Sequence, residues 1–308
     1  MTRPPRARRS CHVVPASSPR MLAKAAVLAA DEVILDLEDS VAPGAKGAAT
    51  REAVVSAALA GTGAATVAVR VNAVDTPHGH RDITAVVEGA AGRIDVLVLP
   101  KVEDETHVTF ADHLLSALEA ELGLEPGRIA LEAQIETARG LTAVDRIATA
   151  CPRRLEALVV GPGDMAASLG MPHTGIGTPV PDYPGDGWHH VLSRVLVAAR
   201  AHGLQAIDGP YAVLGDEAGL RASAGGSRAL GYDGKWSIHP AQIAVLDEVY
   251  GVSDAELARA RAILDAVARA GRDGRGAALL DGEMIDEATR RMAERLLERA
   301  RLAGRDVG

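Results

Sequence analysis

The sequence predicts a (β/α)8 barrel of the TIM type with a C-terminal helical lid extension. Strand-like segments alternate with helix-like segments eight times within about 250 residues, the usual size of this barrel. Several strand segments, such as residues 33–35 and 158–160, are uninterrupted apolar runs, which is typical of parallel strands covered on both faces. The rival fold is a doubly wound open sheet. It would normally carry a Gly-x-Gly-x-x-Gly after an early strand, and the sequence has none there.

Short aliphatic runs predict eight strands, at Cys11–Val14, Val33–Leu37, Thr66–Val71, Ile94–Leu99, Arg128–Ile135, Leu155–Val160, Leu204–Ile207 and Tyr232–Trp236. Helical patterns between them predict helices at Arg20–Ala30, Lys46–Ala60, Asp82–Ala90, Asp104–Leu122, Thr137–Ala150, Trp188–Ala201 and Asp216–Ala229. After the eighth strand we expect a helix at Asp254–Ala270, a loop at Gly271–Gly276 and a charged helix at Ile285–Ala303. A minimal barrel does not need this tail, which would cover its own barrel or reach a neighbour's.

These segments divide the chain into three parts. Residues 1–10 form a flexible basic arm, residues 11–250 the catalytic barrel, and residues 251–308 a helical extension or lid. No apolar stretch follows the arginines of the arm, so we do not expect a signal peptide. No apolar run approaches the ~20 residues needed to cross a bilayer, and we expect no membrane partner.

Composition narrows the class of function. The 308 residues carry 33 Lys and Arg against 41 Asp and Glu, a formal charge of −8, which argues against a nucleic-acid partner. Hydrophobic residues make up 47% and aromatic residues only 2%, so the core must be aliphatic. The two cysteines, Cys11 and Cys151, cannot form a disulfide framework, and a reducing cytoplasmic location is expected.

Polar side chains stand at the C-terminal ends of the predicted strands. In a barrel these ends meet at one rim, where active sites are built. A single such residue has a structural explanation, because Asp and Asn favour strand ends and helix caps and Arg and Lys pair with them. Their number, with carboxylates at four strand ends, favours a catalytic rim. The polar ends are Asp36-Leu37-Glu38-Asp39, Arg70-Val71-Asn72, Pro100-Lys101, Gln134-Ile135-Glu136, Gly161-Pro162-Gly163-Asp164, Asp208 and Lys235.

Glu136 and Asp164 are the candidate metal ligands. They close adjacent strands, and two carboxylates with waters and substrate oxygens suit Mg²⁺, with Mn²⁺ as an alternative. The structural alternative is that Asp164 caps the turn at residues 165–169 while Glu136 pairs with Arg139. The sequence contains no His or Cys spacing suited to zinc.

Arg70 is the candidate for binding an anionic oxygen, because a guanidinium offers directed donors to carboxylates and carbonyls. Its structural alternative is an ion pair with Asp36 and Glu38. The two roles are compatible, since such a pair would also fix the arginine for substrate. No Gly-x-Ser-x-Gly and no catalytic Cys–His signature is present, so a Ser or Cys nucleophile is not supported.

With these residues placed, the chain resembles the citrate lyase β-subunit-like (HpcH/HpaI aldolase/citrate lyase) family of Mg²⁺-dependent acyl-CoA lyases, over about residues 11–301. Residues 173–177, 188–189 and 207–210 look most like the malyl-CoA/β-methylmalyl-CoA lyase branch. Each matching block is weak alone, but together and in order they are specific. The blocks are residues 35–43 (Leu-Asp-Leu-Glu-Asp-Ser-Val-Ala-Pro), 70–72 (Arg-Val-Asn), 99–102 (Leu-Pro-Lys-Val), 135–140 (Ile-Glu-Thr-Ala-Arg-Gly), 163–166 (Gly-Asp-Met-Ala), 234–240 (Gly-Lys-Trp-Ser-Ile-His-Pro) and 281–286 (Asp-Gly-Glu-Met-Ile-Asp).

The resemblance implies roles for individual residues. Glu136 and Asp164 would hold Mg²⁺, Arg70 would bind the oxo acid, and Asp36 and Glu38 would hold the metal's waters and orient Arg70. Asp286 resembles the family's lid aspartate, which a neighbouring subunit places over the active site, and it is our candidate for the catalytic base. A homo-oligomer, either trimer or hexamer, follows from that lid.

The resemblance also implies a CoA-binding surface. Lys24 matches a position that contacts the CoA phosphates, and the loop Ile238, His239 and Pro240 corresponds to one near the CoA. One departure stands out, because Ser18 replaces an arginine of the family's first loop. Arg20 is the candidate to reach the same phosphates. Lys24 as a solvated helix lysine and Asp286 as a helix N-cap are the structural alternatives.

These parts together predict a reversible carbon–carbon lyase. It would cleave a malyl-CoA-like 3-hydroxyacyl-CoA into a short acyl-CoA and a 2-oxo acid such as glyoxylate, with CoA entering only as part of the substrate. Four alternatives remain open: a malyl-CoA thioesterase or malate-synthase-like hydrolase, a CoA-free 2-oxo acid aldolase, a citrate-lyase-type subunit acting on an acyl carrier, and a non-catalytic CoA-metabolite-binding protein.

Overall fold

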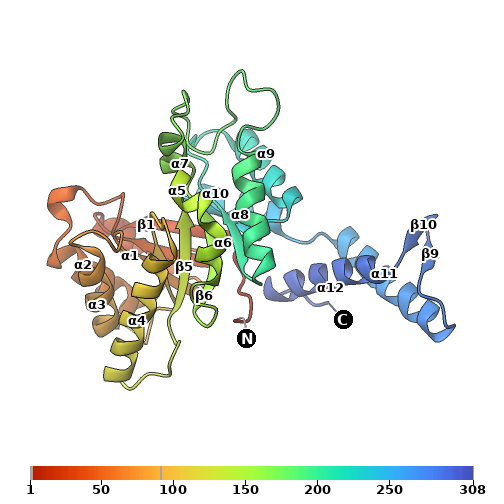
Figure 1. Cartoon of the computed structure of the whole chain (residues 1–308), viewed down its shortest axis with the longest axis horizontal. Coiled ribbons are helices and arrows are strands. Elements are labelled where there is room, and N and C mark those ends of the chain that lie inside the picture. The colour runs from red at the N-terminus through yellow and green to blue at the C-terminus, as the bar shows by residue number, and fades with distance from the viewer. Residues whose placement is uncertain (1–2, 91, 308) are drawn as a thin grey trace. The chain divides into compact units, whose positions relative to one another are not determined.

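The computed structural model describes residues 3–90 and 92–307 and divides the chain into two compact units (Figure 1). The first unit ends at Val249 and the second begins at Tyr250, one residue from the boundary that we expected between barrel and extension. Met1 and Thr2, at the start of the expected flexible arm, lie outside the described residues.

The first unit is a closed barrel of parallel strands in sequence order, with β8 paired back to β1. This confirms the predicted fold class. All eight strands begin and end within two residues of the expected bounds, because their apolar runs are bounded by polar or turn residues. The strands are β1 (Ser10–Pro15), β2 (Glu32–Asp36), β3 (Thr66–Arg70), β4 (Val96–Leu99), β5 (Ala130–Ile135), β6 (Leu155–Val160), β7 (Gln205–Asp208) and β8 (Gly234–Ser237).

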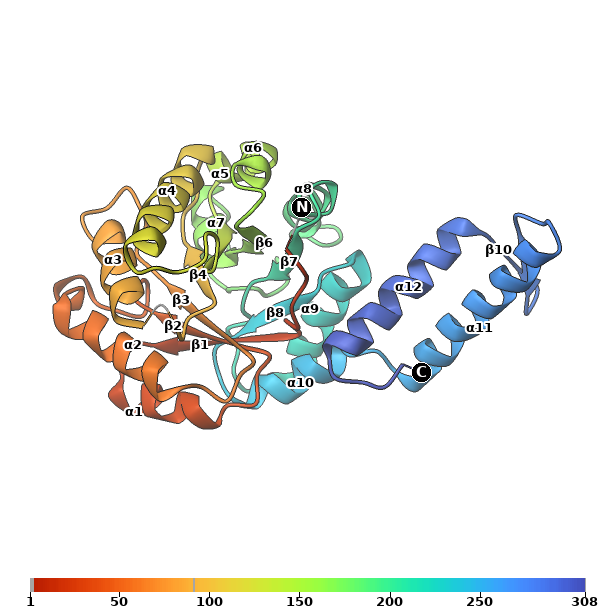
Figure 2. The same ribbon diagram turned by 90° about the horizontal axis from the view of Figure 1, so that it is seen from below.

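Helices surround this barrel (Figure 2). They are α1 (Pro19–Lys24), α2 (Ala48–Ala60), α3 (Gly79–Ala90), α4 (Glu105–Glu121), α5 (Ala138–Thr142), α6 (Val144–Thr149), α7 (Pro162–Ser168), α8 (His189–Ala201), α9 (Glu217–Leu230) and α10 (Ala241–Tyr250), with 3-10 turns η1 (Ala25–Val27) and η2 (Pro43–Ala45). The helix expected at Arg20–Ala30 is α1 followed by η1, and the one expected at Thr137–Ala150 is α5 and α6. None of the helices in the described ranges is long and apolar enough to cross a membrane.

Small aliphatic side chains fill the interior of the barrel. Alternate residues of each strand point inward, and the resulting cluster contains a single aromatic residue, Trp236. Alanine and valine suit this position because the interior of an eight-stranded barrel is just wide enough for side chains to fill it. The cluster is Cys11, Ile34, Ala68, Val96, Val98, Ala130, Ala157, Val159, Ile207 and Trp236, with Val13 packed against it.

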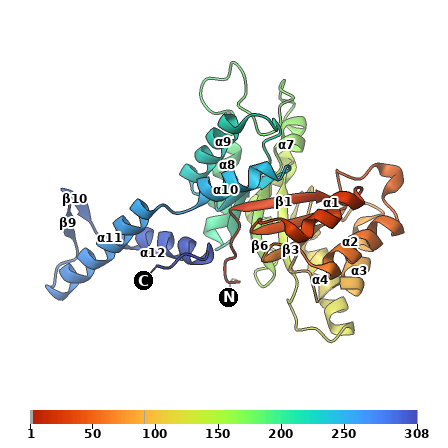
Figure 3. The ribbon, with the colours of Figure 1, turned by 180° about the vertical axis from the view of Figure 1, so that it is seen from behind.

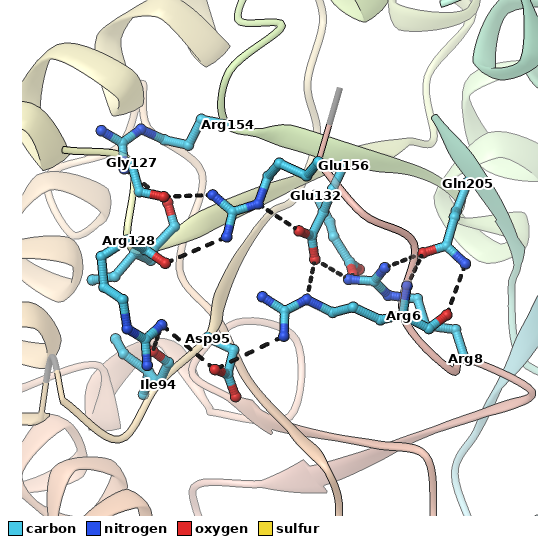
Figure 4. Close-up of polar contacts among 12 residues, drawn as sticks. Arg6, Arg8, Ile94, Asp95, Gly127, Arg128, Glu132, Arg154, Glu156 and Gln205 are labelled. Carbon is cyan, nitrogen blue, oxygen red and sulfur yellow. Dashed lines mark hydrogen bonds and ion pairs between the residues drawn. The ribbon is translucent and has the colours of Figure 1, made fainter. Parts of the chain in front are cut away.

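The N-terminal segment differs from the flexible arm that we expected. Arg8 is fully buried at the end of the barrel where the strands begin, and it forms ion pairs with Glu32, Glu132 and Glu156. Figure 4 shows Arg8 close to Glu156 and Gln205. Arg6 adds a second contact to Glu156 at 3.0 Å. In a sequence, a run of arginines predicts a solvent-exposed segment. Here the arginines instead neutralise carboxylates that the strands place inside the fold.

The second unit is a helical hairpin extended by two short strands, shown from behind in Figure 3. α11 (Asp254–Arg272) packs along α12 (Glu287–Leu302), and β9 (Ala278–Leu280) pairs with β10 (Glu283–Ile285) between them. The strand pair was not predicted. Its turn is Asp281-Gly282, both with positive φ, and Asp-Gly is a strong signal for such a turn.

Candidate active site

The ends of β2 and β3 build an anchored guanidinium. Asp36 and Arg70 are paired in the strand register. The Nε of Arg70 lies 2.6 Å from Oδ1 of Asp36 and its Nη2 lies 2.8 Å from Oδ2, a bidentate ion pair. Nη1 faces Glu38 at 3.3 Å, and the guanidinium lies 5.3 Å from the centre of the Trp236 ring. The ion pair expected as a structural alternative therefore exists, and it fixes Arg70 in one orientation.

Asp36 also shapes the loop that follows β2. Its carboxylate accepts hydrogen bonds from the backbone N–H groups of Glu38 at 2.9 Å and Ser40 at 3.2 Å. Burial alone would raise the pKa of Asp36, but the Arg70 guanidinium and these hydrogen bonds hold that pKa below its usual value. Asp36 is therefore a charged, orienting carboxylate.

Glu136 follows β5 and is only 2% exposed. Its Oε1 accepts the backbone N–H of Lys101 at 2.7 Å, and its Oε2 accepts the side-chain amide of Gln134 at 2.6 Å. Gly161, which follows the neighbouring strand β6, leaves it room, because a Cβ there would overlap the carboxylate. Burial raises the pKa of Glu136 to about 8, against the opposing charges of Lys101 and Arg70.

Asp164 lies in the first turn of α7, directly after β6. It is not the cap of that helix, because the N-cap residue is Gly161 and no side chain bonds there. Arg139 does not fulfil the other structural alternative either, since its ion pairs are with Glu103 and Asp104, at 3.5 and 3.4 Å. Glu136 and Asp164 are thus held at the rim for reasons other than capping or pairing with Arg139.

Lys101 joins these carboxylates; the sequence placed it among the polar strand ends of the rim, but no role was predicted for it. It follows β4, and its ammonium lies 2.5 Å from Glu38 and 3.0 Å from Asp164. The Pro100-Lys101 strand end was visible in the sequence, but only the folded barrel shows which carboxylates the side chain reaches. Gln134 and Gly161 stood among the predicted polar strand ends and Trp236 in a matching block, but none of them was given a role, for the same reason.

The donor chemistry of Glu136 and Asp164 fits Mg²⁺. Both supply hard carboxylate oxygens, and a buried carboxyl with a raised pKa is stabilised in its charged form by a nearby cation. Within residues 3–90 and 92–307 no three His, Cys, Asp or Glu side chains converge in a way that could hold a metal. That is compatible with Mg²⁺, which usually keeps several waters and is held by one or two carboxylates plus substrate oxygens.

The residues expected near CoA lie on neighbouring elements of the same unit. Arg20 and Lys24 are exposed on α1, which follows β1 at the rim. The N–H groups of Ile238 and His239 donate to the side chain of Gln242, which fixes the loop that ends at Pro240. Ser18 accepts a hydrogen bond from the N–H of Met21 and so caps α1.

Asp286 belongs to the second unit and forms the N-cap of α12. Its Oδ1 accepts the N–H groups of Ala288 and Thr289 at 2.9 and 3.1 Å. These bonds, first that of Thr289, hold the pKa of Asp286 below its usual value. The N-cap alternative is therefore present in the structure, and the role of Asp286 over an active site stays a prediction.

Comparison with known proteins places this arrangement in a family. The sequence profile of the HpcH/HpaI aldolase/citrate lyase family matches residues 9–240. The chain is 40% identical to an L-malyl-CoA/β-methylmalyl-CoA lyase of Rhodobacter capsulatus, over 94% of this chain and 93% of that one. It is also 38% identical to a (3S)-malyl-CoA thioesterase of Cereibacter sphaeroides, over 90% of this chain and 89% of that one.

A solved structure agrees with these relatives. The CitE protein of Mycobacterium tuberculosis, in complex with magnesium, acetoacetate and coenzyme A, superposes with a TM-score of 0.74. It is 33% identical, and the match covers 94% of this chain and 97% of that chain. Together with the barrel and the rim of Asp36, Arg70 and Glu136, these matches show that the chain belongs to the HpcH/HpaI aldolase/citrate lyase family.

Proposed function

We propose that this protein is a Mg²⁺-dependent lyase that reversibly cleaves a malyl-CoA-like 3-hydroxyacyl-CoA into a short acyl-CoA and a 2-oxo acid such as glyoxylate. The observation that carries the proposal is the rim itself, where Arg70 is fixed by Asp36 beside the carboxylates of Glu136 and Asp164. The malyl-CoA lyase relative and the magnesium and coenzyme A of the CitE complex support the same chemistry.

The side chains divide the work. Arg70 binds the carboxylate of the 2-oxo acid. Because its bidentate contact with Asp36 already fixes the guanidinium, the side chain loses little conformational freedom when the substrate binds. Glu136 and Asp164 hold Mg²⁺, with Mn²⁺ as an alternative, which when bound polarises the oxo carbonyl and stabilises the charge that develops on its oxygen. Glu38 lies between Arg70 and Lys101 and orders water on this side of the site.

Asp286 completes the machinery as the acid–base group. In the synthetic direction it removes the proton α to the thioester, and the resulting carbanion forms a bond to the oxo carbon. The π bond of the oxo carbonyl breaks in this step, and its oxygen takes a proton from solvent to become the hydroxyl of the product. Cleavage is the reverse: the hydroxyl gives its proton to solvent as the carbonyl re-forms and the carbon–carbon bond breaks, and Asp286 returns a proton to the acyl-CoA carbanion. Its capping bonds use Oδ1, so Oδ2 is the oxygen that we assign to proton transfer. We further propose that it acts across subunits of a homo-oligomer, a trimer or hexamer.

Lys24, Arg20 and the loop of Ile238, His239 and Pro240 are the proposed CoA-binding surface. Two of these are cations for the phosphates of an anionic ligand on a chain whose formal charge is −8. Ser18, which caps α1, offers no charge in place of the family's arginine. Both cysteines are free and buried, which is compatible with a reducing compartment, and we place the protein in the cytoplasm.

The test is to incubate the purified protein with acetyl-CoA and glyoxylate, with Mg²⁺ or with EDTA, and to identify the products by mass spectrometry. We expect malyl-CoA to form with Mg²⁺, without release of free CoA thiol, and formation to stop with EDTA. A panel of other acyl-CoAs and 2-oxo acids then defines the preferred pair. Activity that is indifferent to both EDTA and Mg²⁺ would refute the metal assignment.

A thioesterase is the second candidate, favoured by the thioesterase relative at 38% identity. The same reaction distinguishes it, because a hydrolase releases free thiol and accumulates malate. A subunit that works on an acyl carrier would be inactive on every CoA ester in the panel but active on the carrier-bound acyl group.

A further inference from the structure

Lys101 has an unusual backbone conformation at the centre of the rim. Its φ is +50°, and it is one of three non-glycine residues with positive φ among the residues that the structure describes. The other two, Asp182 and Asp281, are aspartates, a type that adopts this conformation more readily than lysine does. Such strain persists only where the surroundings impose it, and it points to a constraint on where this residue must lie.

That conformation lets one residue contact four carboxylates. The backbone N–H of Lys101 donates to Glu136, at 2.7 Å. The ammonium lies 2.5 Å from Oε1 of Glu38, 3.0 Å from Oδ2 of Asp164 and 3.4 Å from Oδ1 of Asp39. Lys101 therefore touches both of the proposed metal ligands, one through its backbone and one through its charge.

The ammonium and a divalent cation would compete for Asp164. Both are cations drawn to the same carboxylate oxygens, and two cations a few ångströms apart repel each other. The side chain of Lys101 is 33% exposed and keeps Glu38 and Asp39 as partners if it leaves Asp164. Arg70 already faces Glu38 and Asp39 from β3, so the cluster holds two resident cations.

We propose that Lys101 is a resident counter-ion of the metal site, whose ammonium neutralises Asp164 in the metal-free protein and, when a divalent cation binds, leaves Asp164 and keeps only Glu38 and Asp39 as partners. This inference rests on the metal ligands proposed above. It makes Lys101 a positioning residue that sets the affinity for the metal. It also explains how Asp164, Glu38 and Asp39 coexist at one rim before any metal arrives.

The experiment is a titration of the EDTA-stripped full-length protein with Mn²⁺ by calorimetry, without substrate, together with thermal unfolding with and without saturating Mn²⁺. Lys101→Met keeps an unbranched side chain of nearly the same length and the positive φ, and it removes the ammonium with its charge and hydrogen-bond donors. We expect Mn²⁺ to bind roughly tenfold more tightly than to the wild type, because the competing charge is gone. The metal-free variant should melt at a lower temperature than the wild type, and the difference should shrink with Mn²⁺.

Two further variants control for fold and for general charge. Lys101→Gly removes the ammonium and also relieves the positive φ, so it should show the same tighter binding even if Lys101→Met does not fold. Lys46→Met removes a lysine that bonds Oδ1 of Asn72, at 2.6 Å, and its affinity for Mn²⁺ should stay within about twofold of the wild type.

Asp164→Ala separates this inference from the metal assignment. If Asp164→Ala loses Mn²⁺ binding while both Lys101 variants bind as weakly as the wild type, the counter-ion role is refuted and the ligand assignment stands. If Asp164→Ala binds Mn²⁺ normally, the ligand assignment fails and the inference falls with it. An equal loss of melting temperature with and without Mn²⁺ would also overturn the proposal, because it would make Lys101 a purely structural residue.

Discussion

At the scale of single residues, the barrel buries charged side chains at both ends. At the end away from the active site, the buried carboxylates outnumber the buried cations. Arg8 is one guanidinium among Glu32, Glu132 and Glu156, and of these three carboxylates Arg3 and Arg6 contact Glu156 alone. Burial, and then the charge of Glu32, raise the pKa of Glu132 to about 8, although Arg8 opposes this. Near neutral pH the folded protein therefore keeps a proton on Glu132 that the unfolded chain releases.

This raised pKa predicts a dependence of stability on pH. Since the pKa of Glu132 in the unfolded chain is about 4.3, its contribution is complete below that pH and is lost as pH rises through about 8. We expect the free energy of unfolding to fall between pH 5 and 8.5, by on the order of a few kcal/mol from this group. Glu132→Gln, which mimics the protonated form, should flatten the fall in urea unfolding curves. Equal slopes in both proteins would contradict this.

Residue types could be predicted from the sequence better than their contacts. Asp36, Arg70, Glu136 and Asp164 stand at strand ends, and strand ends meet at one rim in any barrel of this kind. Lys101 was visible as a polar strand end, but its contacts depend on a positive φ that lysine disfavours, so the sequence does not reveal which carboxylates it reaches.

At the scale of elements, the long apolar runs were easier to predict than the short segments between them. Two helices were not predicted. α7 is only seven residues long, and no N-cap residue was recognised in the sequence before α10. The divided helices α5 and α6 meet at Ala143, where no Gly or Pro marks the break. The β9–β10 hairpin was not predicted because three residues are too few to show the alternation of a strand. Its Asp-Gly turn is nevertheless a recognisable hairpin signal in the sequence.

The start of α12 carries a prediction of its own. Asp286 both caps this helix and is the proposed base, and asparagine caps a helix about as well as aspartate. Asp286→Asn should therefore leave the melting temperature, Mn²⁺ binding and oxo-acid binding nearly unchanged while turnover falls at least 100-fold. Calorimetry and a malyl-CoA cleavage assay measure these quantities. Retained turnover would remove Asp286 from the mechanism.

At the scale of the whole molecule, two compact units divide the proposed chemistry. The barrel unit contains the metal, oxo-acid and CoA candidates, and the unit from Tyr250 onward contains Asp286 and has an apolar core of its own. The scarcity of aromatic residues agrees with a barrel filled by alanine and valine. Part of the acidic excess, a formal charge of −8, consists of carboxylates that the fold holds around cations at both ends of the barrel.

The central claim is that Glu136 and Asp164 hold a metal that the reaction requires. The most direct measurement is the rate of malyl-CoA cleavage at graded Mg²⁺ concentrations for the wild type, Glu136→Ala and Asp164→Ala, with circular dichroism to verify folding. We predict saturable dependence on Mg²⁺ in the wild type and a loss of at least 1000-fold in both folded variants. Wild-type cleavage that persists in EDTA, or folded variants that keep Mg²⁺-dependent cleavage, would contradict the account.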